Sequence, residues 1–174
     1  MPLGFFILKK RKKIINFILL LCCYIFFKLK IISNKRFKEI YLYLVFNNLK
    51  ENEIKEFVLE FEKDFIKKNL NAELIDEIKK FIEEGDKLII VSSNFDIFLK
   101  KLNLLKNFEI LATEVFFDEN KKCYKIKGNV CKDFEKIRKL ADKYSEKIFE
   151  TGIFYGDSED RVLLQKFKNS VEIK

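Results

Sequence analysis

The chain contains no histidine, and this absence removes several kinds of catalytic and metal-binding site. Without imidazole there is no Ser-His or Cys-His nucleophile pair, no histidine general base and no imidazole ligand for zinc. Cysteine gives no site either, because Cys22, Cys23, Cys123 and Cys131 form no Cys-x-x-Cys pair. Nothing suggests a disulfide framework, so we expect a reducing, cytoplasmic compartment, with Cys22, Cys23 and Cys131 as packed thiols.

Proline and glycine are scarce, at one and five residues in 174, which argues against long structureless linkers. Hydrophobic residues make up 48% of the chain, enough for a real core, and the length suits one domain or a core with a small appendage. The net charge is +8, but most lysines alternate with glutamates, as in residues 50–56. That pattern is typical of solvated helix faces, so we expect no nucleic-acid binding.

One dense basic run, at residues 9–13, precedes an apolar segment at residues 14–27. This order resembles the start of a signal peptide, but no small-residue cleavage site follows. The apolar segment is also shorter than the roughly 20 residues that span a bilayer. We expect a buried or interfacial helix here. Membrane contact through residues 9–32 stays open as an alternative, because basic flanks favour anionic lipid.

Residues 1–84 read as a set of helices. Ser33 is placed to cap a helix over residues 35–46, and Asn71 to cap a later one that ends at Gly85. Between them, apolar residues at helical spacing predict a helix over residues 53–68. We therefore expect an N-terminal helical cap.

Residues 85–174 alternate short apolar runs with helical patterns, which predicts an α/β core with a parallel sheet. The continuous run at residues 87–91 is typical of a strand buried on both faces. The other expected elements are strands at 109–112, 152–155 and 171–173, a hairpin at 115–126, and helices at 96–104 and 133–144. A turn at residues 156–157 is expected to precede a last helix that ends at about residue 167.

Polar residues follow two of these strands and supply a candidate anion site. Ser92 ends the first strand, Asp157 ends the strand at 152–155, and Lys136 lies near the start of a helix. Ligands of open α/β sheets bind beyond the carboxyl ends of the strands. A hydroxyl group, a lysine and a carboxylate there would suit a phosphate group with Mg²⁺, which takes one or two protein carboxylates; Asp160 or Glu159 would supply the second.

The order of these segments resembles the haloacid dehalogenase (HAD) superfamily, in particular its phosphoserine-phosphatase-like subclass IB. Val91-Ser92-Ser93-Asn94-Phe95 is similar to the second motif, Asn129 to Leu140 to the segment with the third-motif lysine, and Tyr155-Gly156-Asp157-Ser158 to the fourth motif. The resemblance covers most of the chain from about residue 14, and its three motifs occur in order. It implies a Rossmann-like core with a helical cap.

The resemblance also implies roles for individual residues. Ser92 and Ser93 would bind phosphate, Lys136 would neutralise the phosphate and the nucleophile, and Asp157 with Asp160 would hold Mg²⁺. The implied reaction is hydrolysis of a small phosphomonoester through an aspartyl-phosphate intermediate. Two features depart from the family pattern: no Asp-x-Asp motif occurs, and Arg161 occupies the usual position of the second fourth-motif acid.

The missing Asp-x-Asp would normally lie on the first core strand, between the strands that end at Ser92 and Asp157. Without that strand, two buried edges would lack a partner. We therefore expect a chain that lacks its true beginning and its nucleophile, and so has little or no turnover. The alternative is that residues 3–8 replace the strand without its acids. A second hypothesis is a membrane-associated protein that binds phosphate without catalysis.

Overall fold

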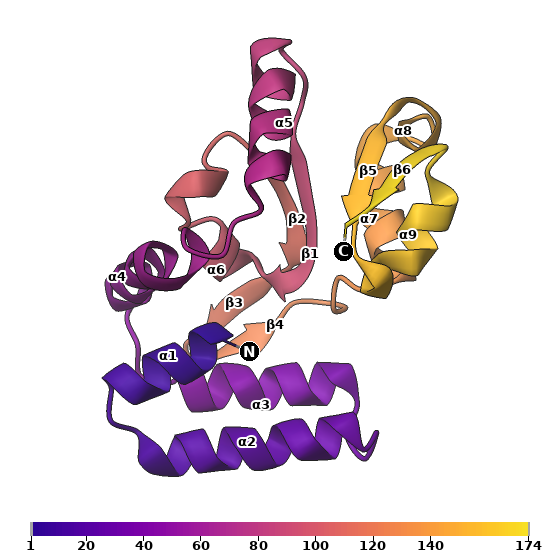
Figure 1. Ribbon diagram of the computed structural model, residues 1–174. Coiled ribbons are helices and arrows are strands. Elements are labelled where there is room, and N and C mark those ends of the chain that lie inside the picture. Colours follow the sequence, from indigo (N-terminus) through magenta and orange to yellow (C-terminus); the bar gives the residue numbers. More distant parts are fainter. Residues whose placement is uncertain (1, 174) are drawn as a thin grey trace.

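The structure, a computed structural model, describes residues 2–173. Helices form the N-terminal half of the chain, and strands begin at residue 89 (Figure 1). The N-terminal helices are α1 (Pro2–Lys10), α2 (Ile14–Lys28), α3 (Asn34–Phe46), α4 (Glu51–Phe61), a π-helical segment (Glu62–Ile66) and α5 (Ala72–Glu83).

The strands of the described residues form three two-stranded sheets. They are β1 (Ile89–Phe95) parallel to β2 (Glu109–Thr113), β3 (Val115–Asp118) antiparallel to β4 (Cys123–Ile126), and β5 (Ile153–Gly156) parallel to β6 (Asn169–Glu172). The later helices are α6 (Asp96–Leu99), α7 (Phe134–Tyr144), α8 (Ile148–Thr151) and α9 (Arg161–Lys166), with 3-10 turns at Asn103–Leu105 and Ser158–Asp160. The predicted α/β class with parallel strands is confirmed. The helix expected over residues 96–104 is in fact α6 followed by a separate 3-10 turn.

The predicted helix ends are confirmed at three residues. The Ser33 side chain accepts a hydrogen bond from the Arg36 amide at 3.2 Å, and the Asn71 side chain accepts one from the Leu74 amide at 3.1 Å. Gly85 has a φ of +82°, a left-handed conformation that glycine adopts without strain and that commonly ends helices. Local sequence signals therefore set these boundaries.

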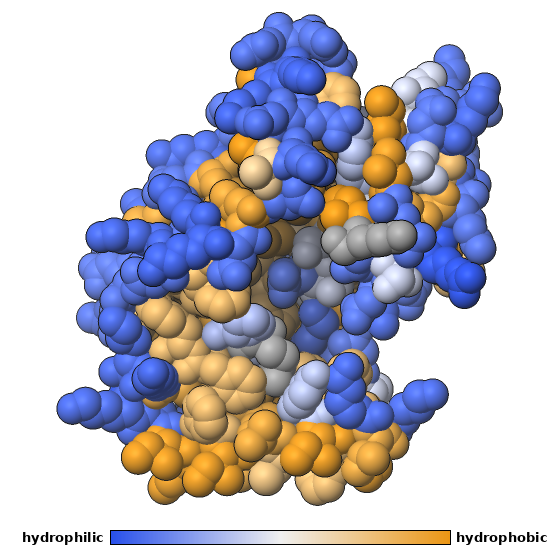
Figure 2. Space-filling view, viewed as in Figure 1, coloured by the Kyte–Doolittle hydropathy of each residue, from blue (hydrophilic) through white to orange (hydrophobic). Residues whose placement is uncertain are grey.

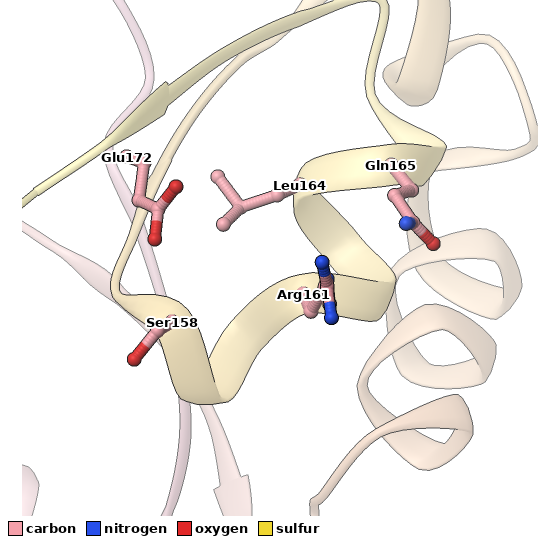
Figure 3. Close-up of a pocket in the computed structure, with 5 residues that line it drawn as sticks. All are labelled: Ser158, Arg161, Leu164, Gln165 and Glu172. Atoms are coloured by element: carbon pink, nitrogen blue, oxygen red, sulfur yellow. The ribbon is translucent and has the colours of Figure 1, made fainter.

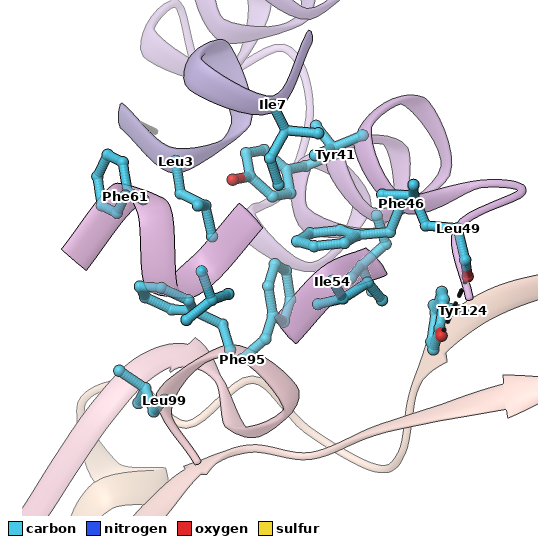
Figure 4. Packing of buried hydrophobic residues seen from close by; sticks show 14 of the residues in the cluster. Leu3, Ile7, Tyr41, Phe46, Leu49, Ile54, Phe61, Phe95, Leu99 and Tyr124 are labelled. Carbon is cyan, nitrogen blue, oxygen red and sulfur yellow. Dashed lines mark hydrogen bonds between the residues drawn. The ribbon is translucent and has the colours of Figure 1, made fainter. Parts of the chain in front are cut away.

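Residues 3–8 are helical and belong to α1, so the prediction that they replace a core strand is wrong. The buried positions of α1 are Leu3, Gly4, Ile7 and Leu8, which recur at helical spacing along one face. Gly4 lies directly against the ring of Tyr41 in α3, where an added Cβ would stand 2.6 Å from the nearest ring atom. Figure 4 shows Leu3 and Ile7 packed with residues of α3, α4 and β1 in the main hydrophobic cluster.

The edges of β1 and β5 that face one another have no partner strand within residues 2–173. The two parallel sheets stand apart (Figure 1), and a cavity of about 430 Å³ lies between them. Its lining is mostly apolar and includes Ile90 and Val91 of β1 and Phe154 of β5. Helix α5 closes one side, where the Tyr155 hydroxyl donates a 2.5 Å hydrogen bond to Glu77. This cavity forms an apolar groove between the two parallel sheets, along the edges of β1 and β5 that have no partner strand.

Helix α2 packs on α1 and α3 with one face and leaves the other in solvent. Leu20 is fully buried, whereas Cys22 is exposed, so the prediction of a packed thiol at Cys22 is wrong. The same prediction is confirmed for Cys131, which is buried. In the part of the chain that the structure describes, no helix has both the length and the apolarity to cross a membrane.

Candidate functional site at the carboxyl end of strand β1

Strand β1 continues past Ser92 to Phe95, with a bulge that places two extra residues opposite β2. Ser92 pairs with Ala112, but the next pair is Phe95 with Thr113, so Ser93 and Asn94 have no counterpart. Within the bulge the Ser92 hydroxyl accepts a hydrogen bond from the Asn94 amide at 3.1 Å. Bulges of this kind re-aim side chains beside active sites. The expectation that Ser92 ends the strand is therefore corrected: Ser92 begins an irregular turn inside it.

The buried hydroxyl of Thr113 links the bulge to the segment before α7. Its Oγ1 donates to the Ser93 carbonyl at 2.8 Å and accepts from the Cys131 amide at 3.0 Å. Thr113 has no solvent exposure, so both contacts lie in a low-dielectric interior where they are strong. This link brings Lys132 and the start of α7 to the carboxyl end of β1.

Lys136, on the first turn of α7, is 5% exposed and forms an ion pair with Asp160. The Asp160 side chain is 24% exposed and lies just before α9. A lysine is almost never this buried without a partner. The pair therefore fixes the Lys136 ammonium group and joins α7 to the turn that follows β5.

Asp157 lies on the surface immediately after β5. One of its oxygens accepts a 2.9 Å hydrogen bond from the Glu159 amide, which caps the 3-10 turn. Gly156 is required before it, because an added Cβ would stand 2.6 Å from the Phe154 ring and 3.1 Å from the Asp160 Cβ. The turn is therefore tightly folded against β5 and holds Asp157 and Asp160 in different surroundings.

Magnesium binding can be tested against these two carboxylates. Across residues 2–173, no three acidic or cysteine side chains gather in a group that could hold a metal ion. Asp160 is engaged with Lys136, which leaves Asp157 and Glu159 as the acids of the turn that are open to solvent. One carboxylate is enough only when phosphate and water complete the coordination of Mg²⁺. The residues therefore fit an ion that arrives with a phosphate group.

Arg161 occupies a separate pocket, away from the Lys136–Asp160 pair. Figure 3 shows it on α9 with Ser158, Leu164, Gln165 and Glu172, which line a pocket of about 420 Å³. A guanidinium group is a cation and has no oxygen to offer a metal ion. The position that holds the second acid in the resembled family thus has no metal-binding capacity here.

Lys38 of α3 is a member of the site that the sequence analysis missed. Its ammonium group donates a hydrogen bond to the Ser93 carbonyl and lies 5.2 Å from the centre of the Phe95 ring. The pKa of Lys38 is lowered to about 8, chiefly by burial and to a smaller extent by the charges of Lys132 and Lys136. Nothing in the sequence distinguished this lysine, because it lies in the cap region among many other cations.

A cleft of about 700 Å³ opens beside these residues, between the N-terminal helices and the end of β1. Its polar lining includes Lys38, Ser93, Asn94, Lys132 and Glu159. Residues of the N-terminal helices, the bulge and the turn after β5 thus share one cavity. Of the predicted site residues, Lys136 and Asp160 meet in an ion pair, Ser93 lines the cleft, and Ser92 and Asp157 make only the local hydrogen bonds described above.

The buried charge of Lys38 predicts a specific pH dependence of stability. The unfolded chain holds this proton up to about pH 10.5, whereas the folded protein releases it near pH 8. Between these values the unfolded chain binds more protons, so the free energy of unfolding rises with pH, by about 1.4 kcal/mol per unit of pKa difference.

We expect Lys38→Met to remove this rise. Urea unfolding at several pH values measures it, with Lys121→Met as the exposed control. Parallel curves for Lys38→Met and the unchanged protein would contradict the assignment.

Comparison with known proteins places the fold in a family. A model of haloacid dehalogenase-like hydrolases matches residues 3–160. A crystal structure of a protein with unknown function from Bordetella pertussis Tohama I is similar, with a TM-score of 0.70 and 15% sequence identity. That similarity covers 86% of this chain and 70% of the other. No curated protein matches the sequence.

Proposed function

We propose that this chain, which belongs to the haloacid dehalogenase-like hydrolase family, binds the phosphate group of a small phosphomonoester beside the bulge of β1. The subclass we propose is the phosphoserine-phosphatase-like one, on the motifs that contain Ser92, Lys136 and Asp157. The cleft beside Ser93 and Asn94 would admit the substrate, and the helical cap would contact the rest of it. The following observations support this proposal.

The observation that carries the proposal is the convergence of lysines on one strand end. Lys38 donates a hydrogen bond to the Ser93 carbonyl; its pKa is lowered chiefly by burial, and the nearby charges of Lys132 and Lys136 act in the same direction. Only one of these three, Lys136, has an acidic partner within residues 2–173. A phosphate dianion would relieve the repulsion between the lysines and would accept hydrogen bonds from Ser92 and Ser93. Fixed cations of this kind supply most of the stabilisation in phosphoryl transfer.

Magnesium enters the proposal as an ion bound together with phosphate. Asp157 would hold it through its free carboxylate oxygen, and the ion would supply charge neutralisation to the phosphate oxygens. Asp160 would keep Lys136 in place instead of binding the ion directly.

The proposal does not extend to turnover by this sequence. The family reaction needs a carboxylate that accepts the phosphoryl group, and the sequence has no Asp-x-Asp motif. Among the nearby acids, Asp160 is neutralised by Lys136, and Asp157 and Glu159 are exposed on the surface. The buried carboxylate of Glu62 lies elsewhere, where it accepts a 2.6 Å hydrogen bond from the Asn103 amide. The proposed function is therefore phosphate-ester binding on a hydrolase fold.

Phosphate binding can be measured by the stabilisation that inorganic phosphate gives against thermal unfolding, since a ligand of the folded state raises its stability by mass action. We expect phosphate to raise the unfolding midpoint of the unchanged chain. Ser92→Ala and Lys132→Gln should each weaken the apparent affinity by about fivefold or more, as expected for the loss of one hydrogen bond or charge. Lys121→Gln, an exposed lysine on the β3–β4 turn, is the control and should bind as before.

A second arm repeats the titration with Mg²⁺ added. Mg²⁺ should strengthen phosphate binding by the unchanged chain and have no effect on Asp157→Asn. The proposal is overturned if phosphate gives no stabilisation, or if Ser92→Ala, Lys132→Gln and Lys121→Gln all behave alike.

A further inference from the structure

The outer face of α2 carries a continuous row of exposed apolar side chains. Ile18 is 54% exposed and Ile25 is 49% exposed, near the middle and the end of the helix. Figure 2 shows this hydrophobic band along the lower edge of the molecule, over α2. Its other members on and just beyond the helix are Ile14, Ile15, Leu19, Leu21, Phe26, Leu29 and Ile31. A contiguous apolar surface of this kind marks an interaction site, because scattered exposed residues do not form such a band.

The charged residues of the segment that carries this face are all positive. Residues 1–38 contain ten Lys and Arg and no Asp or Glu, whereas residues 39–174 contain 25 Lys and Arg against 27 Asp and Glu. The net charge of +8 therefore resides in the segment that includes α2. Lysines flank the helix at both ends: Lys12 and Lys13 precede it, Lys28 ends it and Lys30 follows, all of them exposed. None of these four has an acidic partner among residues 2–173, so their charge is available to a ligand.

We propose that the outer face of α2 docks on the surface of an anionic lipid bilayer. The helix has 15 residues, a length of about 22 Å, which is too short for a hydrocarbon core of about 30 Å, so it would lie in the plane of the interface. Its apolar side chains would enter the acyl boundary while the flanking lysines contact lipid phosphates. A second copy of the chain fits less well, since its own cationic helix ends would meet those of the first. This inference is independent of the proposed phosphate site.

Sedimentation with vesicles tests the docking surface directly. The full chain is mixed with phosphatidylcholine vesicles that contain about 30% phosphatidylserine, or with vesicles of phosphatidylcholine alone, and the bound fraction is measured. We expect binding to the anionic vesicles at least tenfold tighter than to the neutral ones. Salt near 1 M, where the screening length falls to about 3 Å, should weaken it strongly.

Matched variants distinguish binding through the outer face of α2 from nonspecific hydrophobic adsorption to the vesicles. Ile18→Glu with Ile25→Glu should reduce vesicle binding more than tenfold. Ile82→Glu with Phe134→Glu introduces the same charge at residues of α5 and α7 that are 42% and 76% exposed, and should reduce it far less. Lys12→Gln with Lys13→Gln should lower the affinity for anionic vesicles only. Circular dichroism should show the same helix content in every variant.

Three results would overturn the proposal: no binding to anionic vesicles, equal binding to neutral ones, or equal losses in the two glutamate pairs. Analytical ultracentrifugation tests the competing occupant of this face, a second copy of the chain. A dimer that Ile18→Glu with Ile25→Glu dissociates, combined with no vesicle binding, would assign the face to self-association. If Ile18→Glu with Ile25→Glu abolishes vesicle binding and leaves the phosphate titration unchanged, the membrane-docking face and the phosphate site are independent of one another.

Discussion

Incubation of the 174-residue chain with Mg²⁺ and small phosphomonoesters is expected to release no phosphate above the rate in buffer. The carboxyl ends of β1 and β5 present lysines and two exposed acids, Asp157 and Glu159, but the sequence has no Asp-x-Asp motif that would supply the nucleophilic carboxylate of the family reaction. Loss of a covalent nucleophile typically removes about 10⁶ in kcat, so the remaining positive charges cannot restore measurable turnover. Phosphate release followed over hours with several aryl and alkyl phosphates measures the result.

A control variant shows whether any residual activity belongs to this protein. Asp157→Asn should leave the background unchanged, because there is no catalysis for it to remove. Turnover that appears with the unchanged sequence and disappears with Asp157→Asn would refute the claim of a missing nucleophile. It would also direct attention to another carboxylate of the chain.

The same prediction can be tested by an addition to the chain that should introduce phosphatase activity. The groove of about 430 Å³ between β1 and β5 has the place and the apolar lining for one more parallel strand. An N-terminal extension with an apolar strand that ends in Asp-x-Asp should raise the unfolding midpoint by filling the groove, and should introduce turnover. The same extension with Asn-x-Asp should keep the stability gain and lose the turnover. Absence of both effects would show that the groove does not accept a strand.

Much of the fold could be predicted because the signals were local. The caps at Ser33 and Asn71 and the stop at Gly85 depend on one side chain or one backbone conformation each. The apolar run at residues 87–91 predicted β1 without any alternation of polar residues, although residues 89–93 are half-buried and not buried on both faces as expected. For the apolar segment at residues 14–27 the sequence left a buried and an interfacial helix as alternatives, because apolarity alone does not say whether a helix is covered by the rest of the protein. Its exposure depends on which elements pack against it.

The site was less predictable because its geometry depends on contacts between distant segments. The bulge at Ser93 and Asn94 arises from pairing with β2, which is 20 residues away along the chain. Lys38 reaches Ser93 from a helix 55 residues earlier, and no motif contains both residues. Motif resemblance selected Lys136 and Asp160, but their direct ion pair, which occupies the acid, follows only from the tertiary structure. Spacing identifies candidate residues, and packing determines which groups they face.

The second large effect concerns stability and the same ion pair. Asp160→Asn leaves the Lys136 ammonium group, with a side chain only 7% exposed, without its counter-charge. Removing one partner of a buried pair typically costs 3–5 kcal/mol, and we expect about 3 kcal/mol because Asp160 is partly hydrated. Lys136→Met should cost less, about 1–2 kcal/mol, since the Asp160 carboxylate it leaves is 24% exposed and can still contact water. Urea denaturation with a fixed slope measures both.

The decisive result is the double variant, Lys136→Met with Asp160→Asn, which we expect to be more stable than Asp160→Asn alone. Once the buried ammonium group is gone, the neutral amide at position 160 leaves no unpaired charge, so the two losses do not add. The exposed pair Lys122 and Glu119, at 73% and 78% exposure, is the control. Its corresponding variants, Glu119→Gln and Lys122→Met, should each change stability by no more than about 0.5 kcal/mol. Additive losses at residues 136 and 160 would show that Lys136 is hydrated in the folded protein. The anchored cation that the proposed phosphate site requires would then be absent.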